Sequence, residues 1–323
     1  MRLLPHSTSA NQPVIRIVPG GRVLNDILLQ DLVITTTSRP GSLVPGNYGI
    51  QADVPADGSK ISNLVLDRVT VYNMGDDGIY LHALAGVTDS FFVFVTLRNV
   101  QCTLGRHRGL YATNANAVSI SNSFFNSNDD CGIRMENSEL ACWSCGFEDN
   151  CQQADSGSGI TAYLGGQVYL RSCSRSSFLS CHWENFATAA QPVNKRGLTL
   201  VNSPGVTVSS CWFVNPPVPD LNPSVDPDPT GTQRGIYVTY GDAPGVMACT
   251  ILPNRFDNVK TAIEIEAGGP PGRSEAKDCV IFPQFATSTA SSSQRKYLNL
   301  AGAMILPTHA ADNGLVLVGG RHP

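Results

Sequence analysis

A four-residue pattern of glycine, an apolar residue, a variable residue and a second apolar residue recurs along the chain. It occurs at residues 49–52, 78–81, 109–112, 132–135, 159–162, 197–200, 235–238 and 314–317, with an alanine-led variant at 262–265. From 49 to 235 the copies lie 23 to 38 residues apart. Repeats of this length hold two or three strands with their turns, and they stack into a solenoid. The pattern therefore predicts one strand at the same place in each successive coil.

Apolar and polar residues also alternate between these glycine patterns. The alternating segments are 64–66, 69–71, 95–97, 118–120, 124–126, 206–208 and 212–215. A period of two buries one face of a strand. Asparagines tolerate left-handed backbone angles in sharp corners, and they follow many of these strands: Asn73, Asn126, Asn150, Asn185 and Asn215. No amphipathic helical stretch of useful length occurs, so we expect an all-β fold.

This stacked pattern resembles the right-handed parallel β-helix of pectate lyases, polygalacturonases and phage tailspikes, from about Val14 to about Leu317. The resemblance implies an all-β fold, a single-stranded right-handed parallel β-helix (a solenoid) of about nine coils. Residues 1–48 are then an N-terminal segment with the first strands, 49–290 the coils, and 291–323 a C-terminal segment that completes or caps the helix. Prolines cannot donate in a sheet, so we expect a lateral loop at about 214–234.

The composition changes the list of possible partners. The chain has 323 residues, of which 42% are hydrophobic and 15% charged, with a formal net charge of −4. A negative net charge gives no electrostatic basis for binding nucleic acid. No apolar run is long enough to span a membrane, and no apolar segment follows the first six residues as it would in a secretory signal. We therefore expect no nucleic acid, no membrane and no signal peptide.

Ten cysteines occur, and three of them stand two positions before a large aromatic residue: Cys145, Cys181 and Cys211. Equivalent places on successive coils stack, so an inward column of buried thiols is the favoured interpretation. Cys142, Cys145 and Cys151 have a zinc-like spacing, but without a second close pair or a suitable histidine they make a poor zinc site. We predict no metal and no cofactor. The tryptophans beside the column are expected to pack rather than bind: Trp143, Trp183 and Trp212.

Charged residues fill the turn in front of the glycine pattern. Asp76 and Asp77, then His107 and Arg108, then Asp130 occupy this turn on consecutive coils. At ~4.8 Å per coil the first and last carboxylates lie roughly 9–10 Å apart, near the spacing found in inverting glycosidases. One interpretation is a hydrolase site in which the bases bind an anionic sugar. The other is a charge ladder in which the bases neutralise the acids above and below.

Parts of this column resemble the motifs of polygalacturonases. The segment 75–78 is similar to their Asp-Asp element, 105–109 to their histidine element and 132–136 to their arginine element. The resemblance implies that Asp77 is the general acid and that Asp76 assists the water. Asp130 is a further candidate catalytic residue because of its place two rungs away in the same column. Substrate would be held by His107, Arg108 and Arg134.

Two positions depart from the polygalacturonase pattern. The segment 47–49 lacks the expected Asp, and Glu136 stands where a substrate-binding Lys is expected. We therefore do not expect full polygalacturonase activity. The calcium-dependent elimination of pectate lyases is a further option, although isolated acid pairs do not define a calcium cage.

The variable residue of the glycine pattern is predicted to point outward, because its neighbours point inward. Down the coils this row reads Gln51, Tyr80, Tyr111, Arg134, Thr161, Thr199, Tyr237 and Glu264. Tyr80 and Tyr111 are expected on adjacent rungs. Exposed aromatic rings with polar tips stack on sugars or partners, and the alternative is that tyrosine simply favours strands.

These observations lead to three hypotheses. The first is a virus- or phage-type β-helical spike or decoration protein, non-enzymatic, that binds a polysaccharide or host-surface glycan and contacts virion structural proteins. It is expected to be a homotrimer, because no helix is predicted to cover the first rung. It would lie on the virion or extracellular surface, with the cytoplasm as the alternative. The second is an inverting, polygalacturonase-like hydrolase or depolymerase of an acidic polysaccharide. The third is an intracellular scaffold.

Overall fold

The computed structural model describes residues 2–3, 13–36, 47–55, 58–84, 91–150, 166–184, 196–215, 234–239, 248–257, 259, 261–265, 279–282, 284–287, 295–298 and 304–305. The chain divides into two compact units, unit 1 (Met1–Gln152) and unit 2 (Gln153–Pro323). All regular elements in the described ranges are β-strands, as the alternating pattern predicted. These ranges also hold no helix of the length and apolarity needed to cross a membrane.

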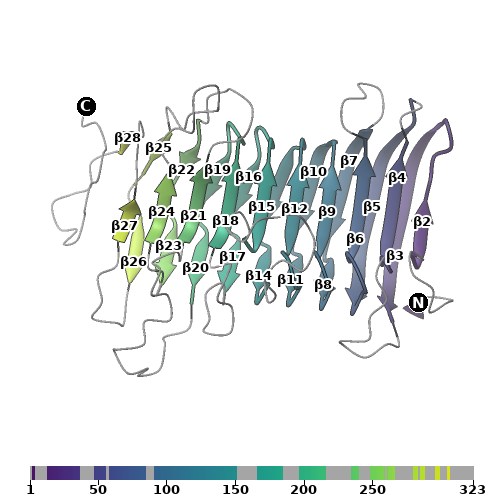
Figure 1. Ribbon diagram of the computed structural model, residues 1–323, viewed down its shortest axis with the longest axis horizontal. Helices are drawn as coiled ribbons and strands as arrows, with labels where there is room; N and C mark the ends of the chain where they lie inside the picture. Colours follow the sequence, from purple (N-terminus) through teal and green to yellow (C-terminus); the bar gives the residue numbers. More distant parts are fainter. Residues whose placement is uncertain are drawn as a thin grey trace. The chain divides into compact units, whose positions relative to one another are not determined.

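The strands form two parallel sheets, which we call sheet A and sheet B. In unit 1, most strands of sheet B lie at the glycine patterns (Figure 1). Its strands are β2 (Ile15–Ile17), β4 (Ile50–Val54), β6 (Ile79–Ala83), β9 (Leu110–Thr113) and β12 (Ile133–Glu136). Each strand pairs in parallel with the next. Ile79, Leu110 and Ile133 are paired positions on three consecutive strands. The stacking predicted from the repeat is therefore confirmed.

Sheet A of unit 1 carries the alternating segments. Its strands are β1 (Arg2–Leu3), β3 (Val23–Thr35), β5 (Lys60–Tyr72), β7 (Phe91–Arg98), β8 (Gln101–Thr103), β10 (Ala115–Ser121), β11 (Phe124–Asn126), β13 (Leu140–Trp143) and β14 (Gly146–Glu148). The long strand β5 pairs with both β7 and β8, so later coils divide the same path into two strands. At the N-terminus, β1 pairs with the end of β3 at Val33 and Ile34.

Unit 2 repeats both sheets. Its sheet B strands are β15 (Val168–Arg171), β18 (Arg196–Val201), β21 (Arg234–Thr239), β24 (Thr261–Ile265) and β27 (Arg295–Leu298). Its sheet A strands are β16 (Ser177–Leu179), β17 (His182–Glu184), β19 (Thr207–Ser209), β20 (Trp212–Val214), β22 (Thr250–Ile251), β23 (Arg255–Asp257), β25 (Val280–Ile281), β26 (Phe285–Thr287) and β28 (Met304–Ile305). These sheet A strands pair in parallel with one another, as in unit 1.

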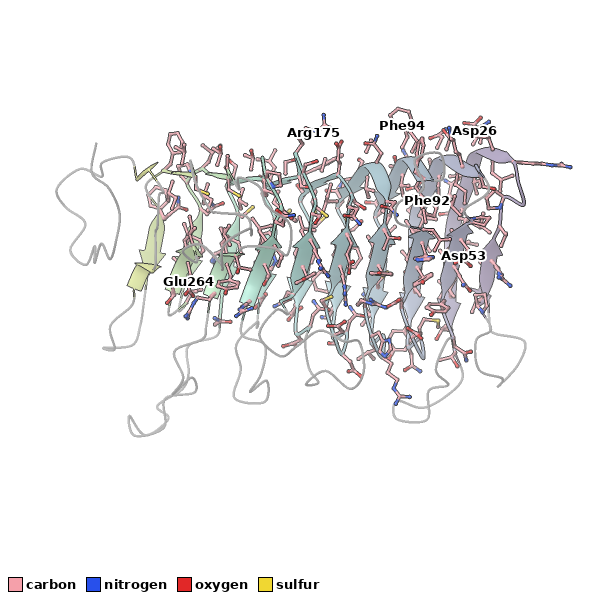
Figure 2. The ribbon with its side chains drawn as sticks, turned by 45° about the horizontal axis from the view of Figure 1, so that its top comes forward. Asp26, Asp53, Phe92, Phe94, Arg175 and Glu264 are labelled. Atoms are coloured by element: carbon pink, nitrogen blue, oxygen red, sulfur yellow. The ribbon has the colours of Figure 1, made fainter. Side chains whose placement is uncertain are left out.

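The core of each unit is a set of columns in which equivalent inward residues pack on one another. Phe92 is fully buried, whereas its neighbour Phe94 is 60% exposed and points away from the core (Figure 2). In unit 2 the buried rings of Trp183, Phe213 and Phe256 stack nearly parallel, with centroids 4.4 and 4.9 Å apart. Such columns bury apolar surface continuously from coil to coil, which is the main stabilising contribution in a solenoid.

Close packing between coils requires several of the glycines that precede sheet B strands. A Cβ atom on Gly78 would lie 2.8 Å from the carbonyl oxygen of Gly109, and one on Gly109 would lie 2.7 Å from that of Gly132. These distances are too short for any side chain, so glycine at these two positions lets the backbones of successive coils approach closely.

The corners use residues with left-handed backbone angles, although not always the ones expected. Asn73 has φ 59°, but at the next expected corner the left-handed residue is Ser127, with φ 53°, directly after β11. Asn150 instead belongs to a buried amide ladder, where its Oδ1 accepts from Asn128 Nδ2 at 2.8 Å. Asn128 Oδ1 in turn accepts from the backbone N–H of Gly105 at 3.0 Å. The ladder fixes the turn that begins at Gly105.

One expected strand of the glycine pattern, at 159–162, lies outside the described residues. The strand paired with β18 is β15, with Val168 opposite Leu198. The expected strand at 314–317, and almost all of the lateral loop at about 214–234, also lie outside the described residues. The C-terminal segment continues the ladders through β27 and β28.

The cysteine column is confirmed for the described residues, and the tryptophan prediction is only partly right. Nine cysteines are free and buried, and Cys151 lies outside the described residues. Trp183 is fully buried, as expected of a packing residue. Trp143 and Trp212 are 39% and 40% exposed, because both lie at outward positions of sheet A strands.

Candidate functional site

The turns in front of the sheet B strands of unit 1 stack as predicted. The N–H of Gly78 donates to the carbonyl of Arg108 at 2.8 Å, and the N–H of Asp130 donates to the carbonyl of His107 at 2.8 Å. These bonds tie three consecutive turns together. The acid, base and acid residues therefore lie on successive rungs of one ladder.

Asp77 and Arg108 form the tightest ion pair of this ladder. Asp77 Oδ1 accepts from Arg108 Nε at 2.7 Å and from its backbone N–H at 3.0 Å, while Oδ2 accepts from Nη2 at 3.0 Å. Asp77 is fully buried. Burial raises the pKa of Asp77, and the guanidinium of Arg108 opposes that rise. Three hydrogen bonds to this carboxylate come from one arginine, which is the geometry of a structural pair rather than of an exposed proton donor.

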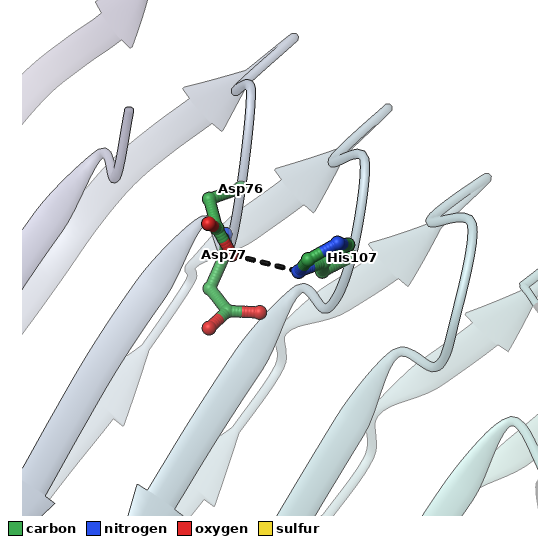
Figure 3. Close-up of side chains that lie close together, drawn as sticks. All are labelled: Asp76, Asp77 and His107. Atoms are coloured by element: carbon green, nitrogen blue, oxygen red, sulfur yellow. Dashed lines mark hydrogen bonds and ion pairs between the residues drawn. The ribbon is translucent and has the colours of Figure 1, made fainter. Parts of the chain in front are cut away.

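Asp76 pairs with the second base. Its Oδ1 lies 2.9 Å from His107 Nδ1 (Figure 3) and also accepts from the N–H of Asp77 at 3.1 Å. The hydrogen bond to Asp76 raises the pKa of His107, although partial burial opposes the rise. Potential ligand atoms of Asp76, Asp77 and His107 lie within 4.8 Å of one another. Because each acid already faces its own cation, the arrangement fits the charge ladder better than a metal cage.

Asp129 and Asp130 have a different environment from the paired acids. Burial raises the pKa of Asp129 to about 6, and it also raises the pKa of Asp130. The Oδ2 atom of Asp130 is buried and has no hydrogen-bond partner in the described part of the chain. An ionised carboxylate in such a place is costly. Burial therefore favours the protonated form of Asp129 and Asp130, and neither of them has an arginine bound as closely as Arg108 is to Asp77.

A row of tyrosines runs beside the charge ladder. Tyr80 and Tyr111 are paired positions on β6 and β9, and their ring centroids are 5.4 Å apart. Tyr48, in the turn before β4, extends the row at 4.7 Å from Tyr80. The rings are tilted by 34° and 39°, and Tyr80 and Tyr111 are partly exposed. The adjacency of Tyr80 and Tyr111 is as predicted, whereas Tyr48 was missed because it stands before its glycine pattern.

Two arginines flank the row. Arg108 lies over the Tyr111 ring at 4.1 Å, and Arg134 lies 5.7 Å from the same ring. Arg134 Nη2 also pairs with Glu136 at 2.7 Å. Glu136, which replaces the lysine expected from polygalacturonases, thus holds a neighbouring arginine. The ladder and the row together form one polar and aromatic surface on unit 1.

The variable residues of the glycine pattern, predicted to point outward, are not exposed to solvent in unit 2. Thr199, Tyr237 and Glu264 are paired positions on β18, β21 and β24, yet they are only 0%, 8% and 8% exposed. The prediction of an outward row that is exposed along the whole chain is therefore wrong there. Thr161 lies outside the described residues. Glu264 pairs with Arg234, so this part of the row is a buried ion pair.

A family of known fold matches most of the chain. The model described as the right-handed beta helix region matches residues 46–299. The chain belongs to the right-handed β-helix family. The fold predicted from the repeat is thereby confirmed, and the number of coils stays a prediction. No curated protein matches this β-helix protein by sequence.

Solved structures share the fold. The tailspike protein gp49 of Pseudomonas phage LKA1 has a TM-score of 0.50 and 13% identity, over 94% of this β-helix protein and 52% of the tailspike chain. The DFA-IIIase of Arthrobacter chlorophenolicus A6 has a TM-score of 0.40 and 13% identity, over 95% and 82% of the two chains. The catalytic domain of a GH87 alpha-1,3-glucanase has a TM-score of 0.40 and 10% identity, over 94% and 58%. The β-helix protein spans about half the length of the tailspike chain, and these likenesses show the fold alone.

Proposed function

We propose that unit 1 binds a glycan, either a polysaccharide or a host-surface glycan, through the tyrosine row Tyr48, Tyr80 and Tyr111. The observation that carries this proposal is the alignment of the three rings, with centroids 4.7 and 5.4 Å apart on consecutive coils. Burial raises the pKa of Tyr80 to about 12, so its hydroxyl is a hydrogen-bond donor at neutral pH. Aromatic surface combined with a few fixed polar groups is typical of small-molecule and sugar sites.

The charges around the row favour an uncharged glycan over an acidic one. The cations nearest the row already have partners: Arg108 pairs with Asp77, Arg134 with Glu136 and His107 with Asp76. An anionic sugar would compete with these carboxylates for the same cations, whose charge the carboxylates already neutralise. The acidic polysaccharide expected from the sequence is therefore not part of the proposal.

The proposed role is that of a non-enzymatic spike or decoration protein of a virus or phage. Its partners would be virion structural proteins and further copies of itself as a homotrimer, and its place the virion or extracellular surface rather than the cytoplasm. The support is the fold shared with the phage tailspike, at 13% identity and over 52% of that chain.

A glycan panel tests the binding site. We expect wild-type protein to bind neutral glycans, and Tyr80→Ala and Tyr111→Ala to weaken binding by about tenfold, which is ~1.4 kcal/mol. Tyr72→Ala is the matched control, because Tyr72 is a 42% exposed tyrosine at the end of β5, on sheet A of the same unit. Equal binding by Tyr80→Ala and wild type would disprove the proposed site.

A second candidate function is glycoside hydrolysis, and the buried Oδ2 of Asp130 favours it. Asp130 has the surroundings of a protonated general acid, while Asp76, which accepts a hydrogen bond from His107, has those of an ionised base. Release of reducing sugar from a bound glycan, abolished in Asp130→Asn with binding retained, would establish it. If the length of the glycan is unchanged after prolonged incubation, hydrolysis is disproved and binding is the only function that remains.

A further inference from the structure

Two pairs of cysteines in unit 2 lie on neighbouring coils. Cys181 and Cys211, which we call the first thiol pair, stand directly before β17 and β20, whose first residues are paired positions. Cys249 and Cys279, the second thiol pair, stand in the same way before β22 and β25. The two members of each pair are 30 residues apart in the sequence. All four side chains are buried in the core.

The main chain holds the members of each thiol pair side by side. The N–H of Trp212 donates to the carbonyl of Cys181 at 2.9 Å, and the N–H of Val280 donates to the carbonyl of Cys249 at 2.8 Å. Neighbouring strands of a sheet lie ~4.8 Å apart, and a disulfide joins Cα atoms about 4.4–6.8 Å apart. The spacing of the coils therefore suits a disulfide between the two cysteines of each pair.

The thiol groups of each pair are also in contact. The side chains of Cys181 and Cys211 are hydrogen-bonded to each other, and so are those of Cys249 and Cys279. The thiol of Cys211 also donates to the carbonyl oxygen of Phe178, on the coil of Cys181, at 3.7 Å. Both sulfur atoms of a pair thus lie within hydrogen-bonding distance, so a small shift brings them to bonding distance once their hydrogens are removed.

The neighbours in each column set the pairing within unit 2. On the coil after the first thiol pair the equivalent residue is Asn254, whose Oδ1 accepts from the N–H of Cys211 at 2.9 Å. On the coil before the second pair it is Val206, whose carbonyl accepts from the N–H of Thr250 at 2.9 Å. Among the described residues of unit 2, each of the four thiols therefore has one cysteine next to it in its column.

We propose that unit 2 forms two disulfides across its coils, Cys181–Cys211 and Cys249–Cys279, by exchange with a low-molecular-weight disulfide. For each bond, one cysteine thiolate attacks the small disulfide and releases a small thiol. The second cysteine then attacks the protein sulfur of the mixed disulfide and releases the other small thiol. Two S–H bonds of the protein become one S–S bond, and the small disulfide is reduced to two thiols that take up the two protons.

Burial decides when the exchange takes place. Burial and the hydrogen bond with Cys181 raise the pKa of the Cys211 thiol, and the hydrogen bond with Cys279 and burial raise that of Cys249. The thiolate is the reactive form, so these thiols react slowly in the folded protein. The exchange therefore takes place while the chain folds, and burial afterwards protects the bonds from reductants. Each bond constrains the unfolded chain and so stabilises unit 2.

Refolding of the unfolded, reduced chain in a mixture of oxidised and reduced glutathione tests the proposal. The product is alkylated in denaturant, and mass spectrometry counts the thiols and maps the bonds. We expect four of the ten cysteines of the wild type to escape alkylation. Cys211→Ala should expose Cys181 to alkylation, and Cys249→Ala should expose Cys279. Cys102→Ala is the matched control, because Cys102 is equally buried but has Val71 and Phe125 at its paired positions, so both bonds should remain.

Thermal unfolding supplies a second measurement. We expect the oxidised wild type to melt at a higher temperature than the reduced one, and the double variant Cys211→Ala/Cys249→Ala to melt at the same temperature in both states. If the chain does not refold, the thiols are counted after incubation of the folded protein with oxidised glutathione in urea just below its unfolding transition. Alkylation of all ten cysteines of the wild type, or disulfides between other cysteines, would overturn the proposal. Glycan binding through Tyr80 lies on unit 1 and does not depend on either result.

Discussion

Replacing Asp130 by Asn is predicted to stabilise the protein at neutral pH. The residue is half-buried, and its buried Oδ2 has no hydrogen-bond partner among the described residues. The amide leaves a polar atom at the same place, but it carries no charge, so the cost of burying an ionised group is removed. We therefore expect Asp130→Asn to raise the melting temperature at pH 7, by roughly 2–4 °C for each kcal/mol gained.

The stability that Asp130→Asn gains over the wild type should decrease as the pH falls. Burial raises the pKa of Asp130 above its ordinary value of 3.8, so as pH rises past 3.8 the unfolded chain loses its proton first and the wild type loses stability. Below that pH both states are protonated, so the charge-related part of the advantage of Asp130→Asn should fade as the pH falls toward 4. Thermal unfolding followed by circular dichroism from pH 4 to 8 measures this.

A control of opposite sign is available on β3. The hydrogen bond from Arg68 lowers the pKa of the exposed Asp31, so Asp31→Asn is expected to reduce stability slightly at neutral pH. Our account of the site would be refuted if Asp130→Asn destabilised the protein at pH 7, or if its gain were the same at every pH. Destabilisation would mean that the Asp130 carboxylate is satisfied in solution, and a gain independent of pH would mean that burial does not raise its pKa.

Three further predictions follow from the packing between coils. Asn128→Ala removes side-chain hydrogen bonds to Gly105, Cys102 and Asn150, and at about 1 kcal/mol each it should lower the free energy of unfolding by roughly 3 kcal/mol in urea titrations. Gly109→Ala places a Cβ 2.7 Å from the next coil's carbonyl oxygen, so we expect a loss of at least about 3 kcal/mol or insoluble protein. The nine described cysteines are buried, and burial raises the pKa of the Cys102 thiol well above its ordinary value; mass spectrometry after thiol labelling should find all nine unmodified until the protein is unfolded.

The sequence predicted the ladder because its signal is local and repeated. Gly78 and Gly109 each mark the start of a strand, and each is needed because the next coil's carbonyl leaves no room for a Cβ. The pattern did not identify β15, which begins at Val168 and pairs with β18, because this strand follows Gly166-Gln167 rather than a glycine and an apolar residue. Pairing with the next strand, and not the motif alone, identifies such a rung.

The site was predictable in its order along the chain but not in its chemistry. The order of acid, base and acid on consecutive turns follows from the spacing of Asp77, Arg108 and Asp130. Arg108 forms a bidentate ion pair with Asp77, whereas Asp130 Oδ2 has no hydrogen-bond partner among the described residues. Both facts depend on side-chain directions, which the spacing of residues along the sequence does not determine. Exposure was hard to predict for the same reason: the outward Thr199 is buried, and Trp212, expected to pack, is exposed.

The corner residues of the last coils of unit 1 recur every 22 or 23 residues. The left-handed residues Asn99 and Asn122 are 23 positions apart, and so are Leu104 and Ser127, whereas Asn122 and Ser144 are 22 apart. A whole coil of 22 or 23 residues is therefore a module that could be excised or duplicated without shifting any later strand to the wrong face. Natural variants of this protein should accordingly differ in length by whole modules, or by insertions confined to the corners.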